Sequence, residues 1–253
     1  MTDVMSDISI PLLLAIGATF FVAGTVKGVT GMGLPTVAMG VLGALISPLV
    51  AASLLIVPSF VTNVWQLLAG PAFCSISRRL WPMMLAICAG TMLGAAWLAN
   101  GDAGATTSVL GVALVIYAGY TLLARQLAVP RRLEPLLSTL VGGLTGIVSG
   151  ATGVFVIPAV PYLQALGLSR DDLVQALGLS FTVSTVALAL ALGAHGAFAM
   201  DTMALSLLAL VPAMIGMWAG QKLRNRISPS AFRRVFLVFL LLLGTEMAYR
   251  PLL

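Results

Sequence analysis

The chain has 253 residues, of which 60% are apolar and only 8% are charged. An ordinary soluble domain carries about 25% charged residues, so this chain has too little polar surface to cover a globule in water. The composition therefore predicts an all-α polytopic membrane protein whose outer surface faces lipid. The net charge of +5 does not indicate nucleic-acid binding, because the basic residues lie in short segments between apolar runs.

Eight apolar stretches follow one another along the chain. The first and fifth, residues 8–46 and 135–168, are longer than one membrane helix needs and are interrupted by glycine-rich segments. Each of these two stretches predicts a hairpin of two short helices. The other six match the length of a single crossing helix and cover residues 48–70, 80–99, 104–124, 171–193, 202–221 and 231–249.

The two halves of the sequence resemble each other at one constant offset. Gly24 matches Gly146, which fixes the offset at 122 residues (146 − 24). The same offset aligns the following pairs: Gly28 with Gly150, Thr30 with Thr152, Gly31 with Gly153, Ser47 with Ser169, and Gly94 with Gly216. We therefore predict a first repeat at residues 1–124, a linker at 125–134 and a second repeat at 135–253, each repeat with about five helical segments.

The basic residues decide the predicted topology, because short cytoplasmic loops carry the excess of Lys and Arg. If each broken stretch crossed the membrane once, six basic residues would lie on either side. If each is a hairpin that returns to its starting side, eleven lie on one face and only Arg250 lies on the other. Lys27 is then left within the membrane. This arrangement makes the halves an inverted repeat, with a cytoplasmic linker and with both termini in the periplasm.

The two glycine-rich joints are the strongest candidates for a binding site. In transporters built from inverted repeats, broken helices mark the substrate site near the membrane midplane. Free backbone N–H groups at a helix start suit an anion, so the sequence predicts such starts near Gly33 and Gly153. The residues predicted to bind substrate at the joints are Lys27, Thr30, Gly31, Gly33, Ser149, Thr152 and Gly153.

Two alternatives stay open for the residues of the joints. A lysine on a membrane helix is costly and therefore usually functional, but Lys27 could instead extend to the headgroups. The pairs Gly24 with Gly28 and Gly146 with Gly150 have the GxxxG spacing, which equally well allows close helix packing alone.

The helices that follow the hairpins carry a second set of polar residues. Asn63, Gln175 and Thr182 are predicted to complete the substrate site, and Gln66, Thr62, Ser184 and Thr185 belong to the same set. The alternative is ordinary hydrogen bonding between helices. Glu246, near the outer end of the last helix, is a candidate either for proton coupling or for an interface position.

The sequence predicts neither an enzyme nor a cofactor. No nucleotide-binding GxxxxGK[ST] loop occurs, and neither a Ser/His/Asp nor an HExxH arrangement appears. No metal site is predicted either.

The glycine elements resemble those of the TauE/SafE sulfite exporter family. They consist of Gly24, Gly28, Gly31 and Gly33 with Pro35, and of Gly146, Gly150 and Gly153 with Pro158. In the second element, Phe155 replaces the glycine that matches Gly33. The resemblance covers essentially the whole chain and implies export of sulfite, an organosulfonate or a related small anion across the bacterial inner membrane.

We therefore expect a secondary transporter that works by alternating access around a midplane site. An anion channel and, less favoured, a non-transporting membrane scaffold are the alternatives. The sequence leaves open which anion is carried, whether a proton or a sodium ion is coupled, and whether the chain forms a homodimer.

Overall fold

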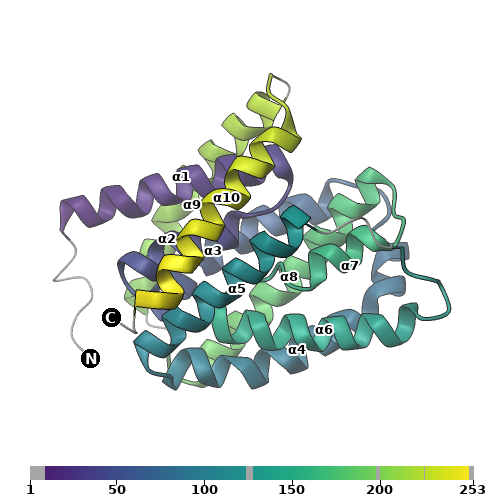
Figure 1. Ribbon diagram of the computed structural model, residues 1–253, viewed down its shortest axis with the longest axis horizontal. Coiled ribbons are helices and arrows are strands. Elements are labelled where there is room, and N and C mark those ends of the chain that lie inside the picture. Colours follow the sequence, from purple (N-terminus) through teal and green to yellow (C-terminus); the bar gives the residue numbers. More distant parts are fainter. Residues whose placement is uncertain (1–8, 124–127, 198–199, 225, 251–253) are drawn as a thin grey trace.

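The computed structural model describes residues 9–123, 128–197, 200–224 and 226–250. These residues form ten α-helices and no strand (Figure 1). Seven of the helices are long and apolar enough to cross a membrane, so the chain is a multi-pass membrane protein. The helices are α1 (Ile10–Thr30), α2 (Leu34–Leu45), α3 (Pro48–Leu68), α4 (Phe73–Asn100), α5 (Ala103–Leu123), α6 (Glu134–Thr152), α7 (Ala159–Ala165), α8 (Arg170–Ala194), α9 (Met200–Arg224) and α10 (Pro229–Tyr249).

The helices follow the segments predicted from the sequence. The six unbroken apolar runs correspond to α3, α4, α5, α8, α9 and α10, and the two broken stretches form the pairs α1–α2 and α6–α7. Five helices therefore lie on each side of the linker. The expected all-α polytopic fold is confirmed.

Helix pairing follows the 122-residue repeat. The helix α1 packs along α9 and α4 packs along α6, while α3 contacts α8 and α5 contacts α10. Figure 1 shows α4 and α6 lying side by side. Exchanging the halves converts the α1–α9 pair into the α6–α4 pair and returns the other two pairs to themselves. Two expectations stay predictions. One is that the two halves are inserted in the membrane in opposite directions, and the other is the division of the chain into two repeats and a linker.

The starts of α3 and α8 repeat the same local structure. The Ser47 hydroxyl accepts a hydrogen bond from the Val50 N–H at 3.2 Å, and the Ser169 hydroxyl accepts one from the Asp172 N–H at 3.1 Å. A serine in this position satisfies a backbone donor that the first turn leaves free. The match between these two serines is therefore structural as well as sequential.

Glycines allow the two longest helix contacts. A Cβ atom added at Gly24 or Gly28 would collide with the backbone of α9, and one added at Gly146 or Gly150 would collide with the backbone of α4. The four glycines of the GxxxG pairs therefore serve close packing, which was one of the two alternatives from the sequence. Through these close backbone contacts, the first helix of each hairpin (α1 or α6) packs against a helix of the opposite half of the chain.

A proline inside α3 explains one contact between α3 and α9. Pro58 has no N–H, so the carbonyl of Leu54 loses its helical partner. The Ser206 hydroxyl of α9 donates to that carbonyl at 2.8 Å and accepts from the Val57 N–H at 3.1 Å. The Ser206 side chain thus supplies, from a neighbouring helix, the hydrogen bond that Pro58 cannot donate within α3.

An ion pair joins α4 to the beginning of α6. The Arg79 guanidinium donates to both carboxylate oxygens of Glu134, at 2.5 and 2.9 Å, and also to the carbonyl of Leu166 at 3.4 Å. The Tyr162 hydroxyl donates to the Glu134 carbonyl at 3.1 Å and lies 2.6 Å from the Ser138 hydroxyl. These contacts hold both helices of the second hairpin against α4.

Candidate functional site

Both glycine joints are true helix breaks. The helix α1 ends at Thr30, and Gly31 and Gly33 adopt positive φ angles of 79° and 103°. The helix α6 ends at Thr152, and Gly153 has a φ of 69°. In this region of backbone conformation a side chain is strained, so glycine is the residue that allows the chain to leave the helix.

The hydroxyls of Thr30 and Thr152 bind the backbone of their own joints. The Thr152 hydroxyl donates to the Val148 carbonyl at 2.6 Å. The Thr30 hydroxyl lies 2.9 Å from the Val26 carbonyl and 2.7 Å from the Met32 carbonyl, and its single proton serves one of the two. Each also accepts from the N–H two residues later, at 3.3 Å from Met32 and 3.2 Å from Val154. In this conformation both hydroxyls therefore stabilise the joints themselves.

The helix starts after the two joints differ. The helix α2 begins at Leu34 directly after Gly33, as predicted. The helix α7 begins only at Ala159, so no helix starts near Gly153, contrary to the prediction. The intervening Val154, Phe155 and Val156 are fully buried outside a helix. Aromatic and β-branched side chains favour burial outside a helix, and Pro158 supplies no N–H to a helix that would include it.

Lys27 lies in the interior of the protein, and only 3% of its surface is exposed. Its ammonium group donates to the Thr62 hydroxyl at 3.0 Å and to the side-chain carbonyl of Asn63, both on α3. The interior position excludes extension to the headgroups in this conformation. In the described residues no carboxylate forms an ion pair with Lys27. A buried cation with only neutral partners is incompletely compensated.

Asn63 also forms a hydrogen bond with a residue of the second half of the chain. Its side-chain N–H donates to the Thr185 hydroxyl of α8 at 3.3 Å. Asn63 and Thr185 are equivalent under the repeat, so the bond joins corresponding positions of the two halves. We call Lys27, Thr62, Asn63 and Thr185 the central polar cluster; all four side chains are buried.

Two buried glutamines near the cluster bind backbone carbonyls at the helix ends around it. Gln66 donates to the carbonyls of Gly31 and Val174, each at 3.0 Å, and so ties the first joint to α8. Gln175 donates to the carbonyls of Leu67 and Gly70, at 2.7 and 2.6 Å, and accepts from the Ala72 N–H at 2.9 Å. The Gln175 side-chain amide thus caps the C-terminal end of α3, and all of these hydrogen bonds are to backbone groups.

Several buried hydroxyls near the joints or on α3 and α8 have no hydrogen-bond partner within the described part of the chain. They belong to Thr36, Ser59, Ser180 and Ser184. A buried polar group without a hydrogen-bond partner costs free energy. Ser59 precedes Thr62 and Asn63 by three and four residues, which places it on the same face of α3.

The sequence matches the family model described as Sulfite exporter TauE/SafE over residues 16–247. The chain belongs to the TauE/SafE family. The match covers nearly the whole chain and confirms the resemblance seen in the glycine elements. Neither the curated proteins nor the solved structures contain a match.

In this TauE/SafE protein, the residues predicted to bind substrate are only partly brought together. Lys27 contacts Asn63, and Gln66, three residues after Asn63 on α3, donates to the Gly31 carbonyl. Ser149 occupies the position that corresponds to Lys27, but its hydroxyl lies 3.2 Å from Thr91 on α4. The Thr182 hydroxyl donates within its own helix, to the Gly178 carbonyl at 2.7 Å. The assignment of these residues to substrate stays a prediction.

Ser59 was not among the residues selected from the sequence. Its signal was the spacing of Ser59, Thr62, Asn63 and Gln66, which recur at the three- and four-residue intervals of one helix face. Glu246, considered for proton coupling, is exposed on α10 and lies 3.8 Å from Arg250.

Proposed function

We propose that this chain is a secondary transporter that exports a small anion, such as sulfite or an organosulfonate, across the bacterial inner membrane. The observation that carries the proposal is the buried Lys27 ammonium, which has neutral hydrogen-bond partners and no carboxylate partner in the described residues. Membership of a sulfite exporter family supports the chemical class of the substrate. An anion beside Lys27 would complete the compensation of the buried charge.

The first joint offers further donors to the same anion. The helix α2 begins there, and the backbone N–H groups of its first turn point away from the helix. The Thr36 hydroxyl in that turn is buried and has no partner within the described residues. A positive side chain and pre-oriented N–H groups at one joint favour an oxyanion over a neutral solute.

Transport then requires that the site opens to each side of the membrane in turn. We propose that one half of the chain rocks against the other around the central polar cluster, which is the movement known for carriers with inverted repeats. A membrane potential that is negative inside itself favours the outward movement of an anion. Coupling to a proton or a sodium ion would add to that driving force.

The test is anion uptake into inverted membrane vesicles or proteoliposomes that contain the Lys27→Gln variant. Sulfite, sulfoacetate, taurine and sulfate form the substrate panel. We expect the preferred anion to lose affinity by roughly 10- to 100-fold, because a hydrogen bond to a charged group contributes about 1.5–3 kcal/mol. Unchanged affinity would remove Lys27 from the site.

The only other lysine of the chain provides the control. Lys222 lies 3.7 Å from the ring of Trp218 on α9, away from the central polar cluster. The Lys222→Gln variant should keep the affinity of the parent protein. Flux that does not saturate with anion and shows no counterflow would assign an anion channel instead of a carrier.

A further inference from the structure

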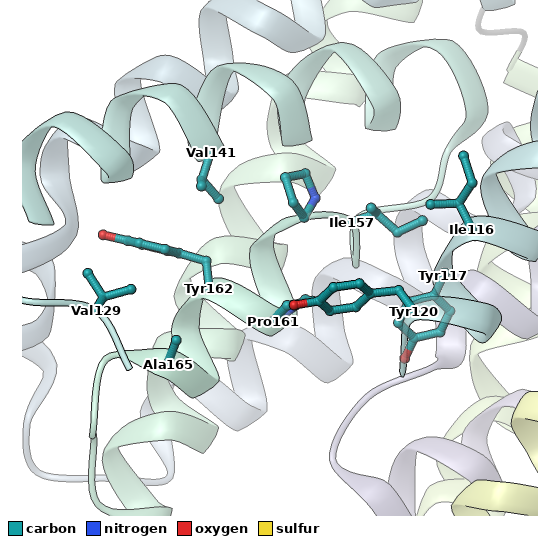
Figure 2. A pocket seen from close by; sticks show the side chains of 10 residues that line it. Ile116, Tyr117, Tyr120, Val129, Val141, Ile157, Pro161, Tyr162 and Ala165 are labelled. Atoms are coloured by element: carbon teal, nitrogen blue, oxygen red, sulfur yellow. The ribbon is translucent and has the colours of Figure 1, made fainter. Parts of the chain in front are cut away.

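A cavity of about 310 Å³ lies between α5, α6 and α7 (Figure 2). Ile116 and Tyr120 line it from α5, Val141 lines it from α6, and Tyr162 and Ala165 line it from α7. The lining is almost entirely apolar. A cavity of this size with mainly apolar walls is typical of a ligand site rather than of a packing defect.

The first hairpin has no equivalent gap at the corresponding positions. Under the 122-residue offset, Gly40 and Gly43 correspond to Tyr162 and Ala165. The helix α10 corresponds to α5 under the same offset. A Cβ atom added at Gly40 would lie 3.0 Å from Leu243 of α10, and one added at Gly43 would lie 3.6 Å from Met247 of α10. The first hairpin therefore packs directly on α10, and the repeated fold does not by itself require the cavity.

The polar groups of the cavity do not suit an anion inside it. The Tyr162 hydroxyl is already engaged with Ser138 and with the Glu134 carbonyl. Tyr117 is buried, and its hydroxyl lies 3.9 Å from the sulfur of Met32. Because the walls offer no cation, an apolar chain is the occupant that they favour.

Positive charge lies next to the cavity on the linker. Val129 lines the cavity, and its N–H donates to the Ala165 carbonyl at 3.0 Å. Arg131 and Arg132 follow two and three residues later; both are exposed, and neither forms an ion pair within the described residues. Arg131 lines a neighbouring pocket together with Trp81 and Glu134. Tyr162 connects the two pockets, because it lines the first and its hydroxyl donates to the Glu134 carbonyl. Basic residues beside an apolar pocket between membrane helices are the typical partner of an anionic lipid headgroup.

We propose that one acyl chain of an anionic phospholipid occupies the cavity and that the lipid phosphate binds Arg131 and Arg132. The bound chain fills the space between α5 and α7, whereas the corresponding space between α10 and α2 is closed by direct contacts. This lipid site is separate from the central polar cluster. It can therefore be tested without knowledge of the transported anion.

The test uses the full chain, purified, stripped of lipid and placed in phosphatidylcholine nanodiscs. A phosphatidylglycerol with a photoactivatable group on one acyl chain is added, and the cross-linked peptides are mapped. We expect cross-links in residues 116–120 and 157–165. An excess of unlabelled phosphatidylglycerol should remove them, whereas phosphatidylcholine and inorganic phosphate should not.

Two kinds of variant distinguish the contribution of the lipid headgroup to binding from that of the acyl chain. The double change Arg131→Gln with Arg132→Gln should lower the affinity for phosphatidylglycerol by about 25-fold, since each basic residue contributes about fivefold. Ala165→Phe, or Val141→Phe if the former does not fold, should abolish the cross-links by filling the cavity. Arg170→Gln and Val112→Phe are the matched controls, because both residues are exposed elsewhere.

Three outcomes would overturn the proposal. The first is cross-links spread evenly over the lipid-facing surfaces of the helices. The second is equal binding of phosphatidylcholine, which would remove the role of the arginines. The third is unchanged labelling in both cavity-filling variants, each shown to be folded, which would place the acyl chain elsewhere.

Discussion

The central polar cluster predicts an unusual response to the change Asn63→Asp. The side-chain carbonyl of Asn63 already accepts a hydrogen bond from Lys27, so an aspartate in its place forms an ion pair with nearly unchanged shape. The new negative charge then cancels the attraction of Lys27 for an anion. Two unit charges 4 Å apart interact by about 4 kcal/mol at an effective dielectric constant of 20.

An interaction of that size corresponds to a loss of anion affinity between about 100-fold and 1000-fold, allowing for partial rearrangement of the site. The assay is anion binding to the purified protein together with uptake into proteoliposomes. The thermal unfolding midpoint should stay equal or rise, because the buried ammonium gains a charged partner. Full anion affinity in a folded Asn63→Asp variant would refute a direct role of Lys27.

A neutral change at the same cluster provides the control. Thr62→Val removes the other acceptor of Lys27 without adding charge. We expect a smaller loss of affinity, about 10-fold, because the ammonium keeps its charge and loses only one positioning hydrogen bond, for which the lower end of the range for charged groups is about 1.5 kcal/mol. A loss as large as that of Asn63→Asp would mean that packing of the cluster, rather than its charge, determines the affinity.

Three changes test the packing of the helices through the unfolding of the purified protein in detergent. Gly146→Leu should destabilise it by at least about 1–3 kcal/mol, because the new side chain meets the backbone of α4, whereas Gly143→Leu points into open space. Ser206→Ala should cost about 1–3 kcal/mol by leaving a buried carbonyl without a partner. Arg79→Gln should cost a similar amount, about 1–3 kcal/mol, because Glu134 loses its paired charge in a largely buried position.

Each of these expectations has a contradicting result. Equal stability of the two leucine variants would mean that α4 and α6 do not meet along their glycines. An unchanged Ser206→Ala variant would mean that Pro58 does not leave a carbonyl in need of a partner. Arg78 is exposed beside Arg79, so a loss in Arg78→Gln as large as in Arg79→Gln would point to general surface charge rather than to the ion pair.

The course of the helices could be predicted because membrane crossing imposes a length on apolar runs. The two stretches of 8–46 and 135–168 were too long for one crossing, and their glycines marked the breaks at Gly31 and Gly153. The late start of α7 could not be predicted, because the burial of Val154 to Val156 outside a helix depends on the surrounding helices. Local glycine chemistry shows where a helix ends but not where the next one begins.

The contact of Lys27 with Asn63 was also beyond the sequence. The two residues are 36 positions apart, and their meeting depends on how α1 and α3 cross. The sequence predicted a polar set that contains Thr62, Asn63 and Gln66; their intervals, with Ser59 added, are those of one face of a helix. Polar side chains on a buried helix face need hydrogen-bond partners, but only the packed structure identifies Lys27 as one of them.

The repeat duplicates the structure of the joints but not their charge. Thr30 and Thr152 each accept a hydrogen bond from the N–H two residues later, whereas Lys27 corresponds to the neutral Ser149. If the anion follows the charge, we expect it to bind at the first joint rather than midway between the two. The second joint would then contribute shape, through the buried Phe155 at the position of Gly33, and a movement of this joint would not have to separate the anion from Lys27.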